Sequence, residues 1–263
     1  MLMMEQTKPD ELLIERLPDG ICLLRLNRPQ AYNALSRELV TQLRAAVASV
    51  AQDTTRVLLL AATQPGFCAG ADLKQRKVMS DEEKYVHNRA INALANEIAA
   101  LPMPTIAVIN GVAMGGGCEI ALACDMRLAA HEAKIGLTEA RMGAMPGAGG
   151  SQRLPRLIGT ARALELMMTG DVVEAARAAE LGLVNAVYDG ADLEAQALAV
   201  AAKLTSRSRR ATALLKDAVY RGMEMPLADA LELERKAVVE ILASDDYKEG
   251  LAAFAEKRPP RFS

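Results

Sequence analysis

The sequence predicts an α/β fold with a helical C-terminal region. Two short, continuous apolar runs, at residues 56–62 and 105–110, are typical of strands that are buried on both faces. They alternate with longer segments of helical periodicity, and crossovers of a dozen or more residues favour a parallel sheet built from right-handed βαβ units. From about Thr160 onward the pattern is mostly helical. The chain has 263 residues, of which 51% are hydrophobic, and this is enough to bury a large core.

The chain begins with a predicted β-hairpin. The apolar runs at residues 11–17 and 21–27 are separated by Pro18-Asp19-Gly20, and Asp-Gly between apolar runs is a strong hairpin signal. A helix is predicted next, over residues 36–53, with Ser36 as its N-cap. Its apolar face repeats at helical spacing. That face consists of Leu39, Leu43, Ala46, Val47 and Val50.

A second long helix is predicted before the strand at 105–110. Ser80 and Glu83 form a capping-box pattern at its start, and the segment "LPMP" from Leu101 ends it. The later helical patterns lie at residues 161–170, 174–184, 191–208, 210–223 and 226–245. Neither a repeat nor a low-complexity linker divides the chain. We therefore expect an α/β core over residues 1–200 and a helical region over 201–263.

Composition argues against several classes of partner. The net charge is −2 and the pI is near 5.9, so nucleic acid is an unfavoured partner. The cysteines lack C-x-x-C spacing and do not cluster with the two histidines, which predicts neither a metal site nor disulfides. The acidic start lacks a cationic leader, and the apolar runs are shorter than a membrane span. We expect a cytoplasmic protein with no membrane partner. The cysteines and histidines are Cys22, Cys68, Cys118, Cys124, His87 and His131.

Two glycine-rich stretches are candidates for ligand binding. Half of the 18 glycines lie between Gly111 and Gly150. The segment "MGGGCE", at residues 114–119, joins a predicted strand to a predicted helix, where free backbone N–H groups attract a negatively charged oxygen. It has neither the G-x-G-x-x-G spacing of a dinucleotide site nor the ending of a P-loop. The glycines equally suit ordinary tight turns.

A second loop follows the strand at residues 56–62. Gly66 and Gly70 allow the backbone to bend sharply there, and small or turn-forming residues lie between and after them. If both loops lie on neighbouring strands, each can direct one N–H group at a single oxygen. That arrangement is an oxyanion hole.

Two carboxylates lie near these loops. Glu119 follows the glycine run within the apolar segment "CEIALAC", and Glu139 lies in "KIGLTEARMG". One interpretation makes Glu119 a helix-dipole partner and Glu139 a surface residue. In the other, a buried carboxyl with a raised pKa is suited to proton transfer.

At these residues the chain resembles the crotonase (enoyl-CoA hydratase/isomerase) superfamily. The resemblance covers nearly the whole chain, because five segments match the family's motifs in order. The segments are "LNRPQAYNAL", "FCAGADLK", "NGVAMGGGCEIALACD", "PGAGGSQRLPRLIG" and "EGLAAFAEKRPPRF". The resemblance implies a spiral of ββα units with a helical C-terminal trimerisation region, and a homotrimer or a hexamer formed by two trimers.

The resemblance also implies the roles of the site residues. The backbone N–H groups of Ala71 and Gly116 would hold the thioester oxygen of an acyl-CoA. Glu119 would accept a proton from the attacking water, and protonated Glu139 would supply one to C2 of an enoyl-CoA. Family members with other activities often lack one of these acids, so a chain that has both resembles a hydratase. No metal or redox cofactor is implied, since CoA is part of the substrate.

Further contacts with CoA are implied by position. Arg28 and Lys74 are candidate partners of the phosphates, or are solvated surface cations. Phe254 and Lys257 are candidates to close the pocket of the same or a neighbouring subunit. The CoA-binding segment, to which Gly116 adds its amide, consists of Ala69, Ala71, Asp72, Leu73 and Lys74.

Three alternatives remain open within this resemblance. The segments at 72–80, 136–143 and 256–262 are most similar to the 3-methylglutaconyl-CoA hydratase branch, and Thr138 replaces a proline typical of straight-chain hydratases. Lys74, Arg76 and Lys77 would then meet a distal carboxylate, or face solvent. An enoyl-CoA isomerase could use one glutamate alone. RNA binding is motivated by the same branch and by the basic stretch at 203–210, but the chain has no tryptophan and only 3% aromatic residues.

Overall fold

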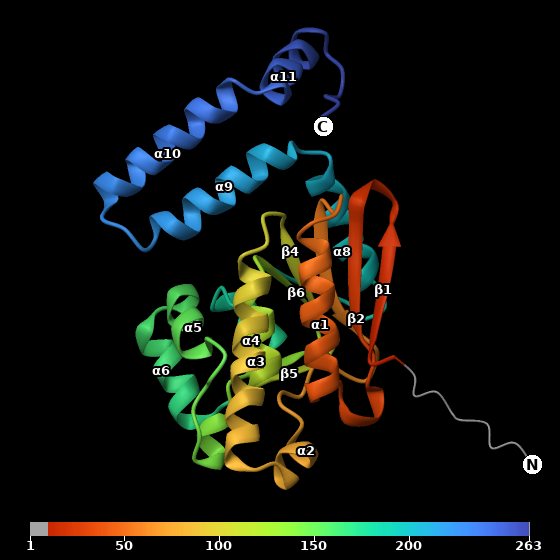
Figure 1. Cartoon of the computed structure of the whole chain (residues 1–263), viewed down its shortest axis with the longest axis vertical. Coiled ribbons are helices and arrows are strands. Elements are labelled where there is room, and N and C mark those ends of the chain that lie inside the picture. The colour runs from red at the N-terminus through yellow and green to blue at the C-terminus, as the bar shows by residue number, and fades with distance from the viewer. Residues whose placement is uncertain (1–9, 263) are drawn as a thin grey trace, which may run out of the picture.

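Figure 1 shows sheets and helices forming one body, from which two long helices extend. The computed structural model of the protein describes residues 10–262, so residues 1–9 of the acidic start lie outside the described residues. The strands of the larger sheet are β1 (Leu12–Leu17), β2 (Ile21–Leu26), β3 (Val57–Ala62), β4 (Thr105–Ile109), β6 (Met126–Ala130) and β9 (Ala186–Tyr188). They pair in the order β1-β2-β3-β4-β6-β9, and all pairs except β1·β2 are parallel. The predicted α/β class and parallel sheet are confirmed.

The predicted N-terminal elements are also confirmed. β1 and β2 form an antiparallel hairpin around a short turn at Pro18–Gly20. Helix α1 (Arg37–Val50) begins where Ser36 accepts a hydrogen bond from the Leu39 N–H through its hydroxyl oxygen. The predicted apolar face of α1 is buried, and every residue of β3 is buried too. Local sequence patterns are enough to predict these elements, because the capping atoms and the apolar periodicity lie within one element.

Two helices connect β3 to β4. The short α2 (Leu73–Val78) has Asp72 as its N-cap, and α3 (Asp81–Ala99) has the predicted capping box of Ser80 and Glu83. In that box each residue's side chain accepts a hydrogen bond from the other's backbone N–H. Two backbone N–H groups at the start of α3, those of Ser80 and Glu83, therefore have hydrogen-bond acceptors.

A smaller sheet lies beside the larger one. It contains β5 (Val112–Met114), β7 (Lys134–Gly136) and β8 (Val173–Glu174) in the order β5-β7-β8. The glycine run follows the strand predicted at 105–110, as expected, but a second, short strand, β5, lies between them. Helix α4 (Gly116–Ala123) begins immediately after β5, with Gly115 at its N-cap. The glycines thus join the smaller sheet to α4.

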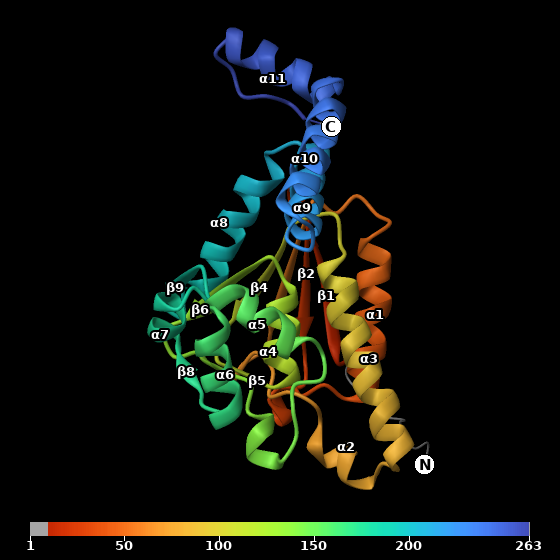
Figure 2. The same ribbon diagram turned by 90° about the vertical axis from the view of Figure 1, so that its left-hand side faces the viewer.

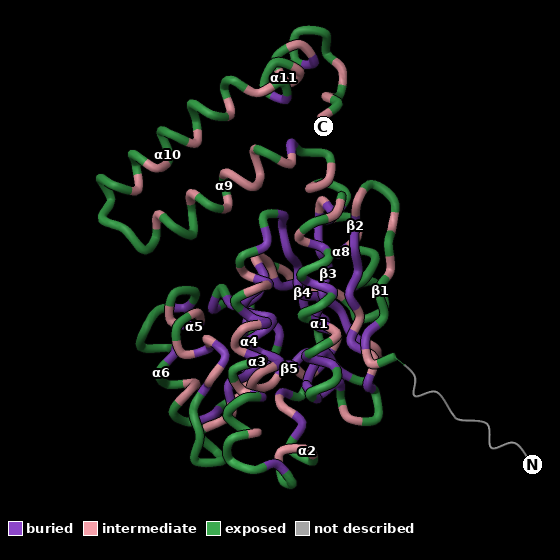
Figure 3. Tube along the Cα trace, viewed as in Figure 1, coloured by how far each residue is buried: buried purple, intermediate pink, exposed green. Residues whose placement is uncertain are grey.

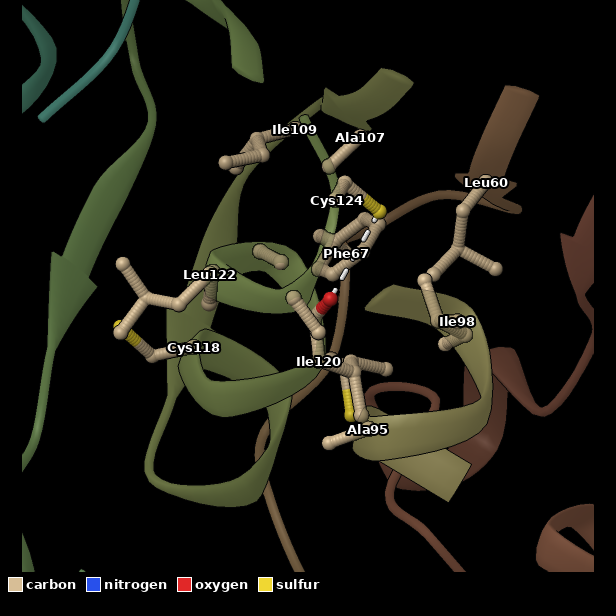
Figure 4. Close-up of a cluster of buried hydrophobic side chains, with 14 of the residues drawn as sticks. Leu60, Phe67, Ala95, Ile98, Ala107, Ile109, Cys118, Ile120, Leu122 and Cys124 are labelled. Carbon is tan, nitrogen blue, oxygen red and sulfur yellow. Dashed lines mark hydrogen bonds between the residues drawn. The ribbon is translucent and has the colours of Figure 1, made fainter. Parts of the chain in front are cut away.

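The larger sheet is covered on both faces. Helices α1, α3 and α4 pack over one face, and α8 (Leu193–Thr205) covers the other, as Figure 2 shows. Figure 4 shows part of the hydrophobic core on the side of the sheet that α3 and α4 cover. There Phe67, Ile98 and Ile120 point toward one another from three segments. Burial of each such side chain contributes roughly 1.5–3 kcal/mol to stability. The body is therefore a rigid support for the loops at the ends of the strands.

The C-terminal region is helical, as predicted. It includes α5 (Gly150–Ile158), α6 (Thr160–Thr169), α7 (Ala175–Glu180), α8, α9 (Arg209–Gly222), α10 (Leu227–Leu242) and α11 (Asp245–Ala255). We call α9, α10 and α11 the arm. The expected boundary at residue 201 falls inside α8, which packs on the larger sheet, and the arm begins at Arg209. Figure 3 shows the arm as mostly exposed, and the buried residues are gathered inside the body. In the described part of the chain, no helix combines the length and apolar character needed to cross a membrane.

Candidate active site

The turn after β3 lies against the start of α4. The Cys68 N–H donates to the Val112 carbonyl oxygen at 2.9 Å, and the Met114 N–H donates to the Cys68 carbonyl oxygen at 2.9 Å. Farther along the turn, a Cβ placed on Gly70 would lie 3.4 Å from the backbone nitrogen of Gly116. The structure therefore brings together the two glycine-containing loops.

Ala71 and Gly116 present their backbone N–H groups at this junction. A Cβ placed on Gly116 would lie 3.7 Å from the Ala71 nitrogen. Leu35 pairs with the two neighbours of Ala71, because its N–H donates to Gly70 at 2.8 Å and its carbonyl accepts from Asp72 at 3.1 Å. The Ala71 N–H consequently points to the other side. Within residues 10–262, no backbone hydrogen bond has either of these two N–H groups as its donor.

Glu119 lies in the first turn of α4 and is only 3% exposed. Its Oε1 atom accepts hydrogen bonds from the backbone N–H groups of Ala148 at 2.6 Å and Gly150 at 2.9 Å. Burial raises the pKa of this carboxyl, and the two amides oppose that rise. The carboxyl group is thus held in one orientation with an increased affinity for a proton.

Glu139 reaches the same loop from a different element. It begins a short 3-10 helix (Glu139–Met142) after β7, and its Oε1 atom lies 3.2 Å from where a Cβ of Gly115 would be. Its Oε2 atom is buried and has no hydrogen-bond partner among the described residues. Burial raises the pKa of Glu139, and the negative charge of Glu119 raises it further. Two acids with raised pKa values therefore lie beside two free amides, and such a site can stabilise an oxyanion and move protons.

A model of the family described as "Enoyl-CoA hydratase/isomerase" matches residues 16–263. The chain belongs to this family. The match contains both amide loops, both acids and the whole arm, and the resemblance to the crotonase superfamily is confirmed.

Relatives of this enoyl-CoA hydratase/isomerase family member match over most of their length. The mouse mitochondrial "Enoyl-CoA hydratase domain-containing protein 2" is 44% identical over 97% of this chain and 90% of its own length. The human mitochondrial "Methylglutaconyl-CoA hydratase" is 40% identical over 98% of this chain and 79% of its own length. The solved enoyl-CoA hydratase of Bacillus anthracis superposes with a TM-score of 0.94 at 40% identity, over 96% of this chain and 98% of that one. The crotonase fold is therefore confirmed.

Arg28 and Asp72 form a buried ion pair in this family member. The Arg28 Nη2 and Asp72 Oδ2 atoms are 2.9 Å apart, and the two side chains are 11% and 8% exposed. Arg28 also lies 3.1 Å from a carboxylate oxygen of Glu11 and donates to the Ala34 carbonyl oxygen at 2.5 Å. Asp72 additionally accepts from the Gln75 N–H at the start of α2. These contacts favour a structural role for Arg28, which joins three segments, over the predicted contact with a CoA phosphate.

The remaining predicted CoA contacts are exposed and lie in two separate places. Ala69, Leu73 and Lys74 lie in or next to the turn that carries Ala71. Phe254, which is 86% exposed, and Lys257 lie at the end of the arm, and Figures 1 and 2 show α11 and α2 at opposite ends of the molecule. The structure therefore does not bring Phe254 and Lys257 to the pocket of the same chain. Closure of a neighbouring subunit's pocket stays a prediction.

Two residues beside the acids carry no role in the sequence-based prediction, and a third, Arg76, was expected only to meet a distal carboxylate or face solvent. Ala148 and Gly150 provide the amides that orient Glu119. They belong to the matched motif "PGAGGSQRLPRLIG", so the motif was the only available signal. Arg76, on α2, acts electrostatically on both acids. In residues 10–262, no group of three or more His, Cys, Asp or Glu side chains is arranged to hold a metal ion.

Proposed function

We propose that the protein is an enoyl-CoA hydratase, which adds water across the C2–C3 double bond of an enoyl-CoA thioester. The observation that carries this proposal is the convergence of two amides, from Ala71 and Gly116, with two acids, the buried Glu119 and the half-buried Glu139. Hydration needs both kinds of group. Relatives at 40–44% identity whose names include hydratase support it further.

The two amides are suited to the thioester oxygen. Attack of water at C3 moves electron density to that oxygen and gives it enolate-like charge. The Ala71 and Gly116 N–H groups donate to it, and Gly116 adds the positive end of the α4 dipole. By analogy with other oxyanion donors, each amide is worth about 3–4 kcal/mol of transition-state stabilisation.

The two acids divide the proton transfers. Glu119 removes a proton from water while the water oxygen bonds to C3, and protonated Glu139 delivers a proton to C2. The product gains one hydroxyl group and one hydrogen, and exchange with solvent restores both acids. Such general acid–base catalysis contributes roughly 10²–10⁴-fold to the rate. The raised pKa of Glu139 favours the protonated form that this role requires.

A branched, dicarboxylic substrate is the second candidate, and Arg76 is the observation that favours it. Its Nε atom is buried without a hydrogen-bond partner among the described residues, and its charge lowers the pKa of both Glu119 and Glu139. A cation at this position is suited to a second carboxylate on the acyl group, as in 3-methylglutaconyl-CoA. The 40% identity to human methylglutaconyl-CoA hydratase is consistent with this choice. Lys74 and Lys77 are exposed.

The basic stretch at residues 203–210 gives little support to RNA binding. Arg210 lies 2.9 Å from the carboxylate of Glu240, and Arg209 donates to the Asp53 carbonyl oxygen at 3.2 Å. These guanidinium groups therefore attach the arm to itself and to the body, which reduces the charge available to a phosphate backbone.

One assay separates the candidate substrates. Loss of the conjugated-thioester absorbance is followed with crotonyl-CoA, a longer straight-chain enoyl-CoA and 3-methylglutaconyl-CoA side by side. If Arg76 binds a distal carboxylate, Arg76→Gln raises KM for 3-methylglutaconyl-CoA and leaves KM for crotonyl-CoA unchanged. Arg177→Gln is the matched control, since Arg177 is exposed on α7 and pairs with Glu180. Failure to hydrate any of the three substrates contradicts the proposed function.

A further inference from the structure

The turn at residues 147–150 holds Glu119 on one side and is itself held on the other. Its two amides, from Ala148 and Gly150, donate to the Glu119 carboxylate. Its carbonyl groups accept hydrogen bonds from side chains. Asn92, on α3, donates through Nδ2 to the Gly147 carbonyl oxygen at 3.1 Å, and Arg153, on α5, donates through Nη1 to the Ala148 carbonyl oxygen at 3.1 Å.

Asn92 acts on the same peptide group that binds the acid. The Gly147 carbonyl and the Ala148 N–H belong to one planar peptide unit, in which they point in opposite directions. A hydrogen bond from Asn92 to the carbonyl therefore fixes the plane whose N–H donates to Glu119. It also polarises that peptide unit and strengthens the second hydrogen bond.

Arg153 connects the turn to α3. Its Nη2 atom donates to Oδ1 of Asn96 at 2.7 Å, and Asn96 in turn donates to Oδ1 of Asn92 at 3.1 Å. Asn92 and Asn96 lie four residues apart on α3 and therefore share one face of the helix. The two asparagines and the guanidinium form a continuous network beneath the turn.

The glycines of this turn allow neighbouring side chains to approach its backbone closely. A Cβ on Gly149 would lie 2.1 Å from the Arg153 Nη1 atom, and a Cβ on Gly147 would lie 2.4 Å from the Asn88 Nδ2 atom. Gly149 also has a φ of +100°, which side-chain-bearing residues rarely adopt. The motif "PGAGGSQR" therefore combines small residues with the arginine that packs over them.

We infer that Asn92 and Arg153 are positioning residues for Glu119, acting through the turn at 147–150. This inference rests on the proposed hydratase function, in which Glu119 must face a water molecule in its ionised form. Without these hydrogen bonds the turn can rotate, and the carboxylate loses its fixed orientation. Misplacement of a reacting group by about 1 Å can cost on the order of 10²-fold in rate.

Kinetics of Asn92→Leu and Arg153→Gln test this inference. We expect kcat to fall roughly tenfold to a hundredfold in each variant while KM changes by less than about twofold. Arg156→Gln is the matched control, since Arg156 lies nearly one turn farther along α5, is exposed and pairs with Glu224. In a Glu119→Gln background, either substitution should cause little further loss. Equal losses in both backgrounds, or unchanged kcat in both variants, would overturn the inference.

The pH profile separates positioning from a general loss of folding. The positive charge of Arg153 lowers the pKa of Glu119, so Arg153→Gln should raise that pKa. Because Glu119 must be ionised to accept a proton, the acidic limb of the kcat/KM profile should move to higher pH. Arg153→Lys keeps the charge, so its acidic limb should stay in place even though kcat falls. An unmoved limb in Arg153→Gln contradicts the inference.

A direct readout does not depend on turnover. The backbone amide NMR signals of Ala148 and Gly150 should titrate with Glu119, because both amides donate to it. Their titration midpoint should be higher in Arg153→Gln and unchanged in Arg156→Gln. If the wild type hydrates no enoyl-CoA but its titration midpoint is still lower than that of Arg153→Gln, the proposed function is contradicted and the network is supported. Identical midpoints in the wild type and Arg153→Gln contradict the network itself.

Discussion

Gly117 lies directly against the carbonyl group of Cys68. A Cβ at position 117 would be 2.2 Å from the Cys68 carbonyl oxygen and 2.7 Å from the Cys68 Cβ atom. That oxygen also accepts the Met114 N–H, so it cannot move without breaking the pairing of the turn with β5. The third glycine of the run therefore permits contact between two backbones. This contact places the Ala71 and Gly116 amides side by side.

The Gly117→Ala substitution should destabilise the protein by about 1–3 kcal/mol, because the added methyl group clashes with backbone and not with a flexible side chain. Urea unfolding measures this change. Gly222→Ala is the control, since a Cβ there would meet only the Ala230 Cβ at 3.4 Å. Equal stability of Gly117→Ala and the wild type would refute the close approach.

Local features of the fold could be predicted from the sequence. The hairpin at Pro18–Gly20, the N-cap Ser36 and the capping box of Ser80 and Glu83 all depend on residues within a few positions of one another. The buried strand β3 was predictable because its whole sequence is apolar. In each case the interacting atoms belong to one short segment, so the pattern contains the information.

Other features depend on contacts between distant segments. β5 and β9 have three residues each, too few for a periodic pattern, and their partners come from elsewhere in the chain. The pairing of Arg28 with Asp72 joins residues 44 positions apart. The sequence predicts that Glu119 and Glu139 are chemically unusual, but the network through Asn92 and Arg153 appears only when α3 and α5 are packed together.

Glu119→Gln and Glu139→Gln should each lower the rate of enoyl-CoA hydration by roughly 10²–10⁴-fold. The amide of glutamine keeps the size of the side chain but cannot exchange the proton that each step requires. The conjugated-thioester assay measures both variants against Glu165→Gln, which changes an exposed residue of α6. A fully active Glu139→Gln would instead favour a mechanism with one glutamate, as in the isomerase alternative.

Glu139→Gln should also change the pH dependence of stability. Burial raises the pKa of Glu139 in the folded state, so the folded protein binds this proton more tightly than the unfolded chain does. The resulting stabilisation is complete below the unfolded pKa and is lost as the pH rises through the folded pKa. A glutamine side chain does not titrate, so at this position the variant loses no stability over that pH range. The variant should therefore gain stability relative to the wild type as the pH rises from about 4 to about 7.

Urea unfolding at the two pH values measures this difference. Glu165→Gln should show no comparable gain, because its side chain is exposed. If Glu139→Gln instead loses stability as the pH rises, relative to the wild type, Glu139 is not held in a site that disfavours its charge.

The arm should mediate self-association. Its two long helices pack against each other along an apolar groove that includes Leu215, Val219, Leu231 and Val238, each of which is 46–66% exposed in one chain. Exposed apolar surface of this kind is typical of an interface, and burial contributes roughly 25 cal/mol per Å². A second copy of the chain is the expected partner, as the resemblance implies.

The charged substitution Leu231→Asp should therefore shift a homotrimer or hexamer toward monomers in analytical ultracentrifugation. Ile14→Asp changes an apolar residue of β1 with similar exposure, outside the arm, and should leave the mass unchanged. A wild-type chain that sediments as a monomer would contradict the expectation, and so would a Leu231→Asp variant with the wild-type mass.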